Sequence, residues 1–271
     1  MSSDVRRPAA KYAPVATKVP QITALFWVIK VLTTGMGEAT SDWLGGIDLV
    51  LAGGVGVVGF AVALWLQFRT DRYRPVVYWF AVAMVAVFGT MVADVVHVAG
   101  VPYAVTTPFY AVALAVVFTL WWRSEGTLSI HSITTRRREV WYWLTVLVTF
   151  ALGTAAGDLT ATSLHLGFFW SGVLFAGVML VPLAGFRLGV NEVATFWTAY
   201  VITRPLGASF ADWFGKEHSF GGGLGYGDGP VAGVMLLAIV GLVGVVASQD
   251  RHPAGGPERA TAGRPGRSAV R

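Results

Sequence analysis

The stretch FWTAYVITRPLGASFAD, residues 196–212, begins with an aromatic pair, continues through an apolar middle and ends in an aspartate. Three other stretches follow the same plan: FWVIKVLTTGMGEATSD at 26–42, YWFAVAMVAVFGTMVAD at 78–94 and YWLTVLVTFALGTAAGD at 142–158. In every copy a Gly lies ten residues after the Trp, and an Asp lies fifteen residues after it. This constant spacing identifies an internal repeat in four copies.

The composition of the 271-residue chain is that of a membrane protein. Hydrophobic residues make up 55% and charged residues only 13%, whereas charged residues are about a quarter of a typical soluble domain. The chain has no Cys, which excludes disulfides, thiolate metal ligands and cysteine nucleophiles. The N-terminus lacks the apolar core and cleavage site of a signal peptide, so we expect the first helix to direct insertion.

Eight apolar segments are each long enough to cross a bilayer core of about 30 Å as a helix. They lie roughly at 21–44, 46–68, 75–97, 103–123, 140–162, 166–187, 192–214 and 229–248. The repeated Trp, Gly and Asp always fall on the odd-numbered segment. The sequence therefore predicts an all-α multi-pass membrane protein of about eight transmembrane helices, arranged as four helical-hairpin repeats.

The basic residues predict how these helices face, since short loops rich in Arg and Lys stay in the cytoplasm. Seventeen of the twenty lie in the two tails and in the loops after the second, fourth and sixth segments. We therefore expect both termini in the cytoplasm and the repeated Asp toward the outside. The same bias accounts for the net charge of +5, so nucleic acid is not predicted as a partner.

This topology predicts four parts: a cytoplasmic N-terminal tail at 1–18, a transmembrane domain at 19–248, a cytoplasmic linker at 124–138 and a disordered cytoplasmic C-terminal tail at 249–271. The repeats are expected at about 19–72, 73–123, 139–189 and 190–248. The Gly-rich run at 218–230 lacks the Lys-Ser/Thr ending of a phosphate loop, so we interpret it as a flexible outer loop.

The repeated Trp and Gly have structural interpretations. We interpret the Trp residues as belt residues that anchor the helices at the lipid headgroups. The repeated Gly residues are expected to let neighbouring helices approach closely, as small residues do between membrane helices. A local break in the helix is the functional alternative for these positions, which are Gly37, Gly89, Gly153 and Gly207.

The four repeated aspartates are the strongest candidates for a function, because an ionised carboxylate at the centre of a membrane helix costs about 2.5 to 3.5 kcal/mol. Two interpretations stay open. The acids are helix-end residues that pair with backbone or basic groups, or they surround a central cavity that binds a cation or relays protons. They are Asp42, Asp94, Asp158 and Asp212.

Three copies place an oxygen-bearing side chain one position after the repeated Gly: Glu38, Thr90 and Thr154. Each lies four residues before its Asp and therefore on the same helical face. Carboxylates with hydroxyl oxygens are hard ligands that suit Mg, Ca or Mn, although the sequence does not identify a metal. His97, three residues after Asp94, is a candidate for a metal pair or a proton relay, with an interfacial role as the alternative.

Two basic residues lie inside the predicted helices and are candidate charge partners of these acids. Lys30 belongs to the first copy, and Arg204 lies eight residues before Asp212 in the fourth. The five acids outnumber the two bases by three if all are ionised. A pathway with this excess of negative charge favours cations.

The chain resembles a family of bacterial integral, membrane-anchored proteins of unknown function that are built from a four-copy repeat, itself of unknown function. The resemblance rests on KVPQITALFWVIKVLTTGMGEATSD at 18–42, EGTLSIHSITTRRRE at 125–139, ALGTAAGDLTA at 151–161 and TRPLGASFADW at 203–213. It implies a multi-pass protein of the bacterial cytoplasmic (inner) membrane and supplies no activity or site residues.

Two functions remain open on the sequence. The first is a transporter of a small cation, either a divalent metal or one coupled to protons, which uses the intramembrane acids. The second is a membrane scaffold or sensor in which the acids are structural. We expect no enzyme, since the chain shows no nucleophile and base, and no cofactor beyond a bound cation. The expected partners are the lipid bilayer and a small cation, and the sequence predicts no oligomeric state.

Overall fold

A computed structural model describes residues 16–251; most of the predicted N-terminal tail and the C-terminal tail from residue 252 lie outside the described residues. In this part of the chain the regular structure is helical. The Trp-Gly-Asp segments form α1 (Ala24–Ile47), α3 (Pro75–Val98), α5 (Arg136–Asp158) and α8 (Glu192–Gly215). The other helices are α2 (Leu49–Phe68), α4 (Tyr103–Glu125), α6 (Gly167–Val178), α7 (Leu180–Arg187) and α9 (Asp228–Arg251).

Six helical segments of the described chain are long and apolar enough to cross a membrane. They correspond to α2, α3, α4, α5 with the turn that follows it, α6 together with α7, and α9. The helices α1 and α8 are not among them, although each has 24 residues, because their interiors carry charged side chains. Length and composition thus support a membrane protein, while the full set of eight spans remains a prediction.

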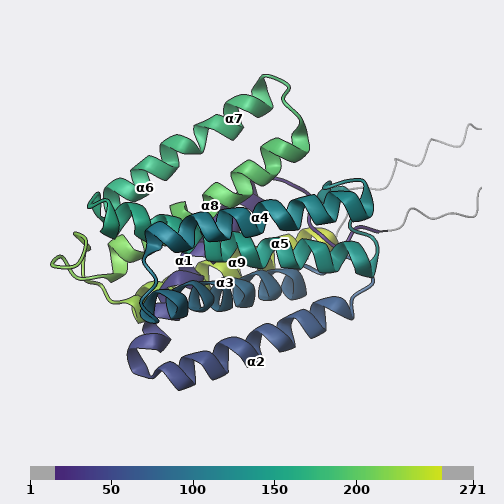
Figure 1. Ribbon diagram of the computed structural model, residues 1–271. Helices are drawn as coiled ribbons and strands as arrows, with labels where there is room; N and C mark the ends of the chain where they lie inside the picture. The colour runs from purple at the N-terminus through teal and green to yellow at the C-terminus, as the bar shows by residue number, and fades with distance from the viewer. Residues whose placement is uncertain (1–15, 252–271) are drawn as a thin grey trace, which may run out of the picture.

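The four motif helices form a closed core. α1 packs against α3 and α8, and α5 packs against the same two helices. The remaining helices lie around this core, with α2 and the α6–α7 pair on opposite sides of it (Figure 1). The charged helices α1 and α8 are therefore neighbours within the core.

Each outer helix packs mainly against the motif helix of the next repeat. α2 contacts α3 more extensively than α1, α4 contacts α5 more than α3, and α6 contacts α8. The last helix, α9, closes the series by packing along α1. The helices of one predicted hairpin are adjacent in sequence, but each hairpin completes its packing only with the following copy.

The repeated Trp residues lie inside the protein. Trp79, Trp143 and Trp197 are 5% exposed or less, and their rings contact the buried Tyr78 and Tyr142. Their interpretation as headgroup anchors is therefore wrong for these three copies. The large rings instead fill the space between the four motif helices near their N-terminal ends.

A buried polar network fixes the chain before α1 at the same end of the core. The Lys18 ammonium donates to Glu139 Oε2 at 2.7 Å, and the Gln67 amide donates to Glu139 Oε1 at 3.0 Å. The backbone N–H of Lys18 donates to the Ile133 carbonyl at 3.0 Å. One carboxylate thus joins the N-terminal segment, the end of α2 and the start of α5.

Candidate functional site: a polar column in the four-helix core

The interior of the core is built from one stripe of side chains on each motif helix. Residues four positions apart lie on one helical face, and the stripe runs from the aromatic residue before the Trp to the Asp. In four copies it gives five sets of equivalent residues. From the N-terminal end they are Phe26, Tyr78, Tyr142 and Phe196; Lys30, Val82, Val146 and Tyr200; Thr34, Ala86, Phe150 and Arg204; Glu38, Thr90, Thr154 and Ala208; and Asp42, Asp94, Asp158 and Asp212.

The repeated glycines lie at the contacts between neighbouring motif helices. A Cβ atom added to any of them would overlap the next motif helix around the core. The residue met is always the one three positions before that helix's own Gly, so the same contact recurs four times. The contacts are Gly37 with Ala86, Gly89 with Phe150, Gly153 with Arg204 and Gly207 with Thr34.

Arg204 lies fully buried at the centre of the core and pairs with Glu38. Its Nη2 donates to Glu38 Oε2 at 2.7 Å, to Thr154 Oγ1 at 2.7 Å and to Thr90 Oγ1, while its Nη1 donates to the Thr34 carbonyl at 2.9 Å. The side chains of Arg204 and Glu38 are 0% and 3% exposed. One guanidinium therefore meets the oxygen-bearing residues of the other three copies.

Lys30 is held by aromatic rings in place of a carboxylate. Its Nζ lies 4.4 Å from the Phe150 ring centroid and 4.3 Å from that of Tyr200. Within residues 16–251 this Nζ has no hydrogen-bond partner. The Arg204 guanidinium lies 5.0 Å from the same Phe150 ring, so the two basic side chains share one aromatic contact. Of these two described basic residues, Arg204 forms an ion pair with a carboxylate and Lys30 does not.

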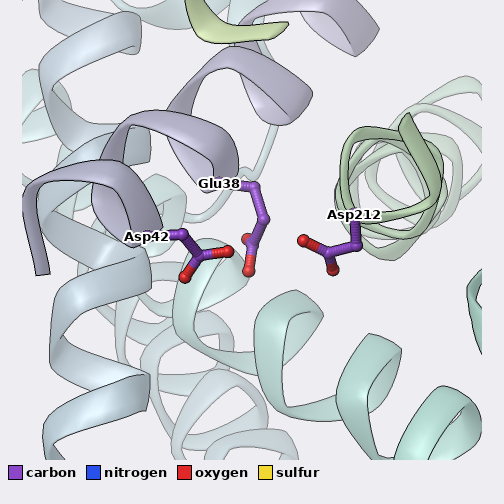
Figure 2. A group of neighbouring side chains, drawn as sticks. All are labelled: Glu38, Asp42 and Asp212. Carbon is purple, nitrogen blue, oxygen red and sulfur yellow. The ribbon is translucent and has the colours of Figure 1, made fainter. Parts of the chain in front are cut away.

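Three carboxylates converge at the other end of the core. Glu38 and Asp42 from α1 and Asp212 from α8 each place one oxygen within 4.8 Å of the other two, and we call this group the acid triad. Figure 2 shows Asp212 reaching from its helix toward the two carboxylates of α1. Asp212 is 4% exposed, and its Oδ1 has no hydrogen-bond partner in the described part of the chain.

The two other repeated aspartates flank the acid triad. Ser41 Oγ donates to Asp94 Oδ2 at 3.4 Å, and Asp158 interacts with the hydroxyl of Tyr103. Asp158 is followed at once by a π-helical turn, Leu159–Ser163, which the other motif helices do not carry. Single π-turns often mark functional sites. The structure thus divides the predicted ring of four aspartates into two triad members and two flanking acids.

His97 lies apart from the acid triad. It is exposed, its ring stacks on Tyr103 with centroids 3.8 Å apart, and its Nδ1 lies 3.2 Å from the Val101 carbonyl. The carboxylate group that could hold a metal among the described residues does not include it. The structure therefore places His97 at the rim of the acidic end.

Lys216, which the sequence analysis did not assign, reaches the acids from the loop after α8. Its Nζ lies 2.7 Å from Asp42 Oδ2 and 3.2 Å from Asp228 Oδ2. Burial alone would lower the pKa of this ammonium, but the carboxylates of Asp42, Asp212 and Asp228 outweigh burial and raise its pKa above the usual range. A sequence signal was present: Lys216 is the one basic residue of the predicted outer loops and lies four positions after Asp212.

The Gly-rich segment 216–227 folds back along the end of α8. The N–H groups of Leu224 and Tyr226 donate to the carbonyls of Trp213 and Phe214 at 2.7 and 3.0 Å. These bonds satisfy carbonyls that a helix end otherwise leaves free. Glycines with φ near +70°, such as Gly221, allow the reversals. The expectation that this run is flexible is corrected, because its backbone is bonded to the core helix. Its location outside the membrane stays a prediction.

Comparison with known proteins agrees with the repeated architecture. Four segments of the chain, residues 25–73, 77–127, 141–187 and 195–252, match the family described as Repeat of Unknown Function (DUF347). No curated protein and no solved structure matches the chain. The four matched segments cover most of the chain, and each contains one motif helix with the outer helix or helices that follow it. The chain therefore belongs to the DUF347 repeat family and carries four copies of its repeat.

Proposed function

We propose that the protein spans the bacterial cytoplasmic membrane eight times, with both termini in the cytoplasm. The six apolar helices support this, and α1 and α8 complete the set because the other helices shield their charged faces. The distribution of Arg and Lys supports the orientation. In this orientation the acid triad lies toward the outside and the buried tyrosines toward the cytoplasm.

We propose further that the protein binds a small cation and carries it across the membrane. The observation that carries this proposal is the acid triad, in which three carboxylate oxygens from two core helices lie within 4.8 Å of one another. Buried carboxylates repel one another strongly unless a cation or bound protons neutralise them. The unpartnered oxygen of the buried Asp212 is a ligand atom that no group among residues 16–251 satisfies.

Glu38 connects the acid triad to the centre of the core. Its Oε2 already accepts from Arg204, Thr90 and Thr154. A cation bound at the triad competes with Arg204 for Glu38, and loss of that bond frees the guanidinium to move. In the observed arrangement Arg204 is a fixed positive charge in the middle of the column, which opposes passive flow of cations.

The ligand atoms favour a hard divalent cation such as Mg²⁺, Mn²⁺ or Ca²⁺, since all are oxygens and no thiol or imidazole lies in the triad. Coupling to protons fits the same acids, because a carboxylate that loses its cation inside a low-dielectric core takes up a proton in its place. The partners proposed are thus the bilayer and the cation.

A scaffold or sensor is the alternative function. The observation that favours it is the density of the core, in which the repeated glycines bring the helices into contact and Arg204 satisfies Glu38. In that case the acids serve packing and charge balance only. We propose no enzymatic activity under either alternative.

Transport by purified protein in vesicles distinguishes the alternatives. Uptake of Mn²⁺ should be measured for the wild type and for Asp→Asn variants at Asp42, Asp94, Asp158 and Asp212, each with its melting temperature in detergent. Asn removes the charge with little change of shape, so Asp42→Asn and Asp212→Asn should lose uptake while staying folded.

Asp48→Asn is the matched control. Asp48 caps α2 through a bond to the Leu51 N–H at 2.7 Å and lies outside the core, and Asn caps helices as well as Asp does. Uptake should therefore be normal in this variant. Normal uptake by all four stable core variants, or no uptake of Mn²⁺, Mg²⁺ or Ca²⁺ by the wild type, would leave the scaffold as the better account. A metal-tolerance screen of a deletion strain is the corresponding test in cells.

A further inference from the structure

We propose that Lys216 is a tethered competitor for the cation site: its ammonium occupies the outer side of the acid triad and must be displaced before a cation binds. This inference rests on the proposed cation site and adds the group that sets its affinity and selectivity.

The position of the ammonium supports direct competition. Lys216 Nζ lies 2.7 Å from Asp42 Oδ2, and Asp42 is a member of the acid triad. Its charge also lies close enough to Asp212 for the two to attract each other. The Lys216 ammonium thus lies where an incoming cation would first contact the carboxylates, and it occupies part of the proposed cation site.

The backbone of Lys216 is fixed, so only the side chain has to move. Its N–H donates to the Asp212 carbonyl at 2.8 Å, and its carbonyl accepts from the Gly225 N–H at 2.8 Å. Because the anchor is rigid, the local concentration of the ammonium at the triad stays high. A free cation must therefore bind the triad more strongly than the tethered ammonium does in order to displace it.

Asp228, at the start of α9, offers the displaced ammonium a second position. Its Oδ2 lies 3.2 Å from Lys216 Nζ, and its Oδ1 has no hydrogen-bond partner among the described residues. Gly215 permits this approach, since a Cβ there would overlap Asp228 Oδ1. The ammonium can therefore leave Asp42 and remain paired with one carboxylate.

This arrangement favours divalent over monovalent cations. A divalent ion interacts with the triad about twice as strongly as the ammonium at equal distance, whereas Na⁺ or K⁺ carries only the same single charge. Valence therefore decides whether the ammonium is displaced.

The test measures Mn²⁺ binding to the full-length protein in lipid nanodiscs by calorimetry, with and without excess Na⁺. Removal of the competitor by Lys216→Met should raise the affinity for Mn²⁺ at least about tenfold, given the strength of an ion pair near a protein surface. It should also make Mn²⁺ binding more sensitive to Na⁺. Lys216→Gln, which is neutral but polar, should behave alike if the Met variant is unstable.

Two further variants separate this effect from general charge and from folding. Arg187→Met removes one positive charge at the far end of the α6–α7 pair and should leave affinity unchanged. Asp228→Asn removes the second position of the ammonium and should weaken Mn²⁺ binding. If the wild type binds Mn²⁺ and both Lys216 variants fold but bind it no more tightly, the proposal of a competing lysine is wrong. The proposed cation site is not affected by that result. Absence of binding in the wild type and in both variants overturns both.

Discussion

Arg204 and Glu38 form an ion pair at 2.7 Å between residues that are 166 positions apart in sequence, at the buried centre of the core. Thr90 and Thr154 bond to both partners, so all four motif helices contribute to this pair or to its immediate contacts. The four copies thus have the same backbone arrangement but contribute different side chains to the centre: one base, one acid and two hydroxyl groups.

Arg204→Leu should strongly destabilise the protein, since it leaves Glu38 buried without its partner. Breaking a buried pair by removing one member costs about 3 to 5 kcal/mol. Thermal and denaturant unfolding in detergent should show this loss. Leu at both Arg204 and Glu38 should recover most of it, because the double change leaves no unpaired charge. A double variant as unstable as Arg204→Leu alone would show that the pair is not what holds the centre together.

Gly37→Ala should destabilise the core, because the new methyl group would overlap the Ala86 side chain and the backbone of α3. Overpacking of this kind costs about 1 to 3 kcal/mol. Gly54→Ala on α2 is the control, since nothing lies within 4 Å of its added Cβ and Ala stabilises helices by about 0.5 to 1 kcal/mol relative to Gly. The melting temperature should fall for the first and hold or rise for the second; equal shifts would refute the packing role.

Reporter fusions should map the proposed orientation. Fusions after residues 72, 137 and 190 are expected to read as cytoplasmic, and a fusion near residue 222 as external. Arg residues cluster around the first two positions, and Arg187 lies just before the third. An alkaline phosphatase and a fluorescent protein give opposite signals and so control for expression. The reverse pattern would place the acid triad on the cytoplasmic side.

The ion pairs of Lys216 should stabilise the protein equally between pH 8 and pH 9. A base whose pKa is raised by folding contributes fully below its unfolded pKa, which is about 10.4 for Lys, and the contribution is lost only as pH rises through the higher folded value. The difference in melting temperature between the wild type and Lys216→Met should therefore be constant over this range. A difference that disappears below pH 9 would contradict the raised pKa.

The sequence alone predicted the helices and the repeat because both depend on local spacing. Its segments agree with the observed helices to within a few residues at most ends; α5 alone begins four residues early. The i, i+4 spacing also placed Glu38, Thr90 and Thr154 on the faces that bear the aspartates, and the structure brings these three residues together around Arg204.

The partners of these residues could not be predicted in the same way, since they depend on the order of the helices around the core. Arg204 meets Glu38 because α8 and α1 are neighbours, which closes a ring between the two ends of the chain. The contact between Lys216 and Asp42 could not be predicted, because it requires a loop that folds back on α8. Burial of the Trp residues follows from the same closure, which turns a face expected to meet lipid toward three other helices.

The ring of motif helices can close only late in synthesis, because its last member, α8, is made long after α1. Glu38 is synthesised as part of α1, whereas Arg204 lies 166 residues later, so at about 5 to 20 residues per second the acid lacks its partner for roughly 8 to 30 s. The α9 surface that covers α1 is synthesised later still. A nascent chain that stops before α8 therefore lacks the base that pairs with Glu38 in the complete core.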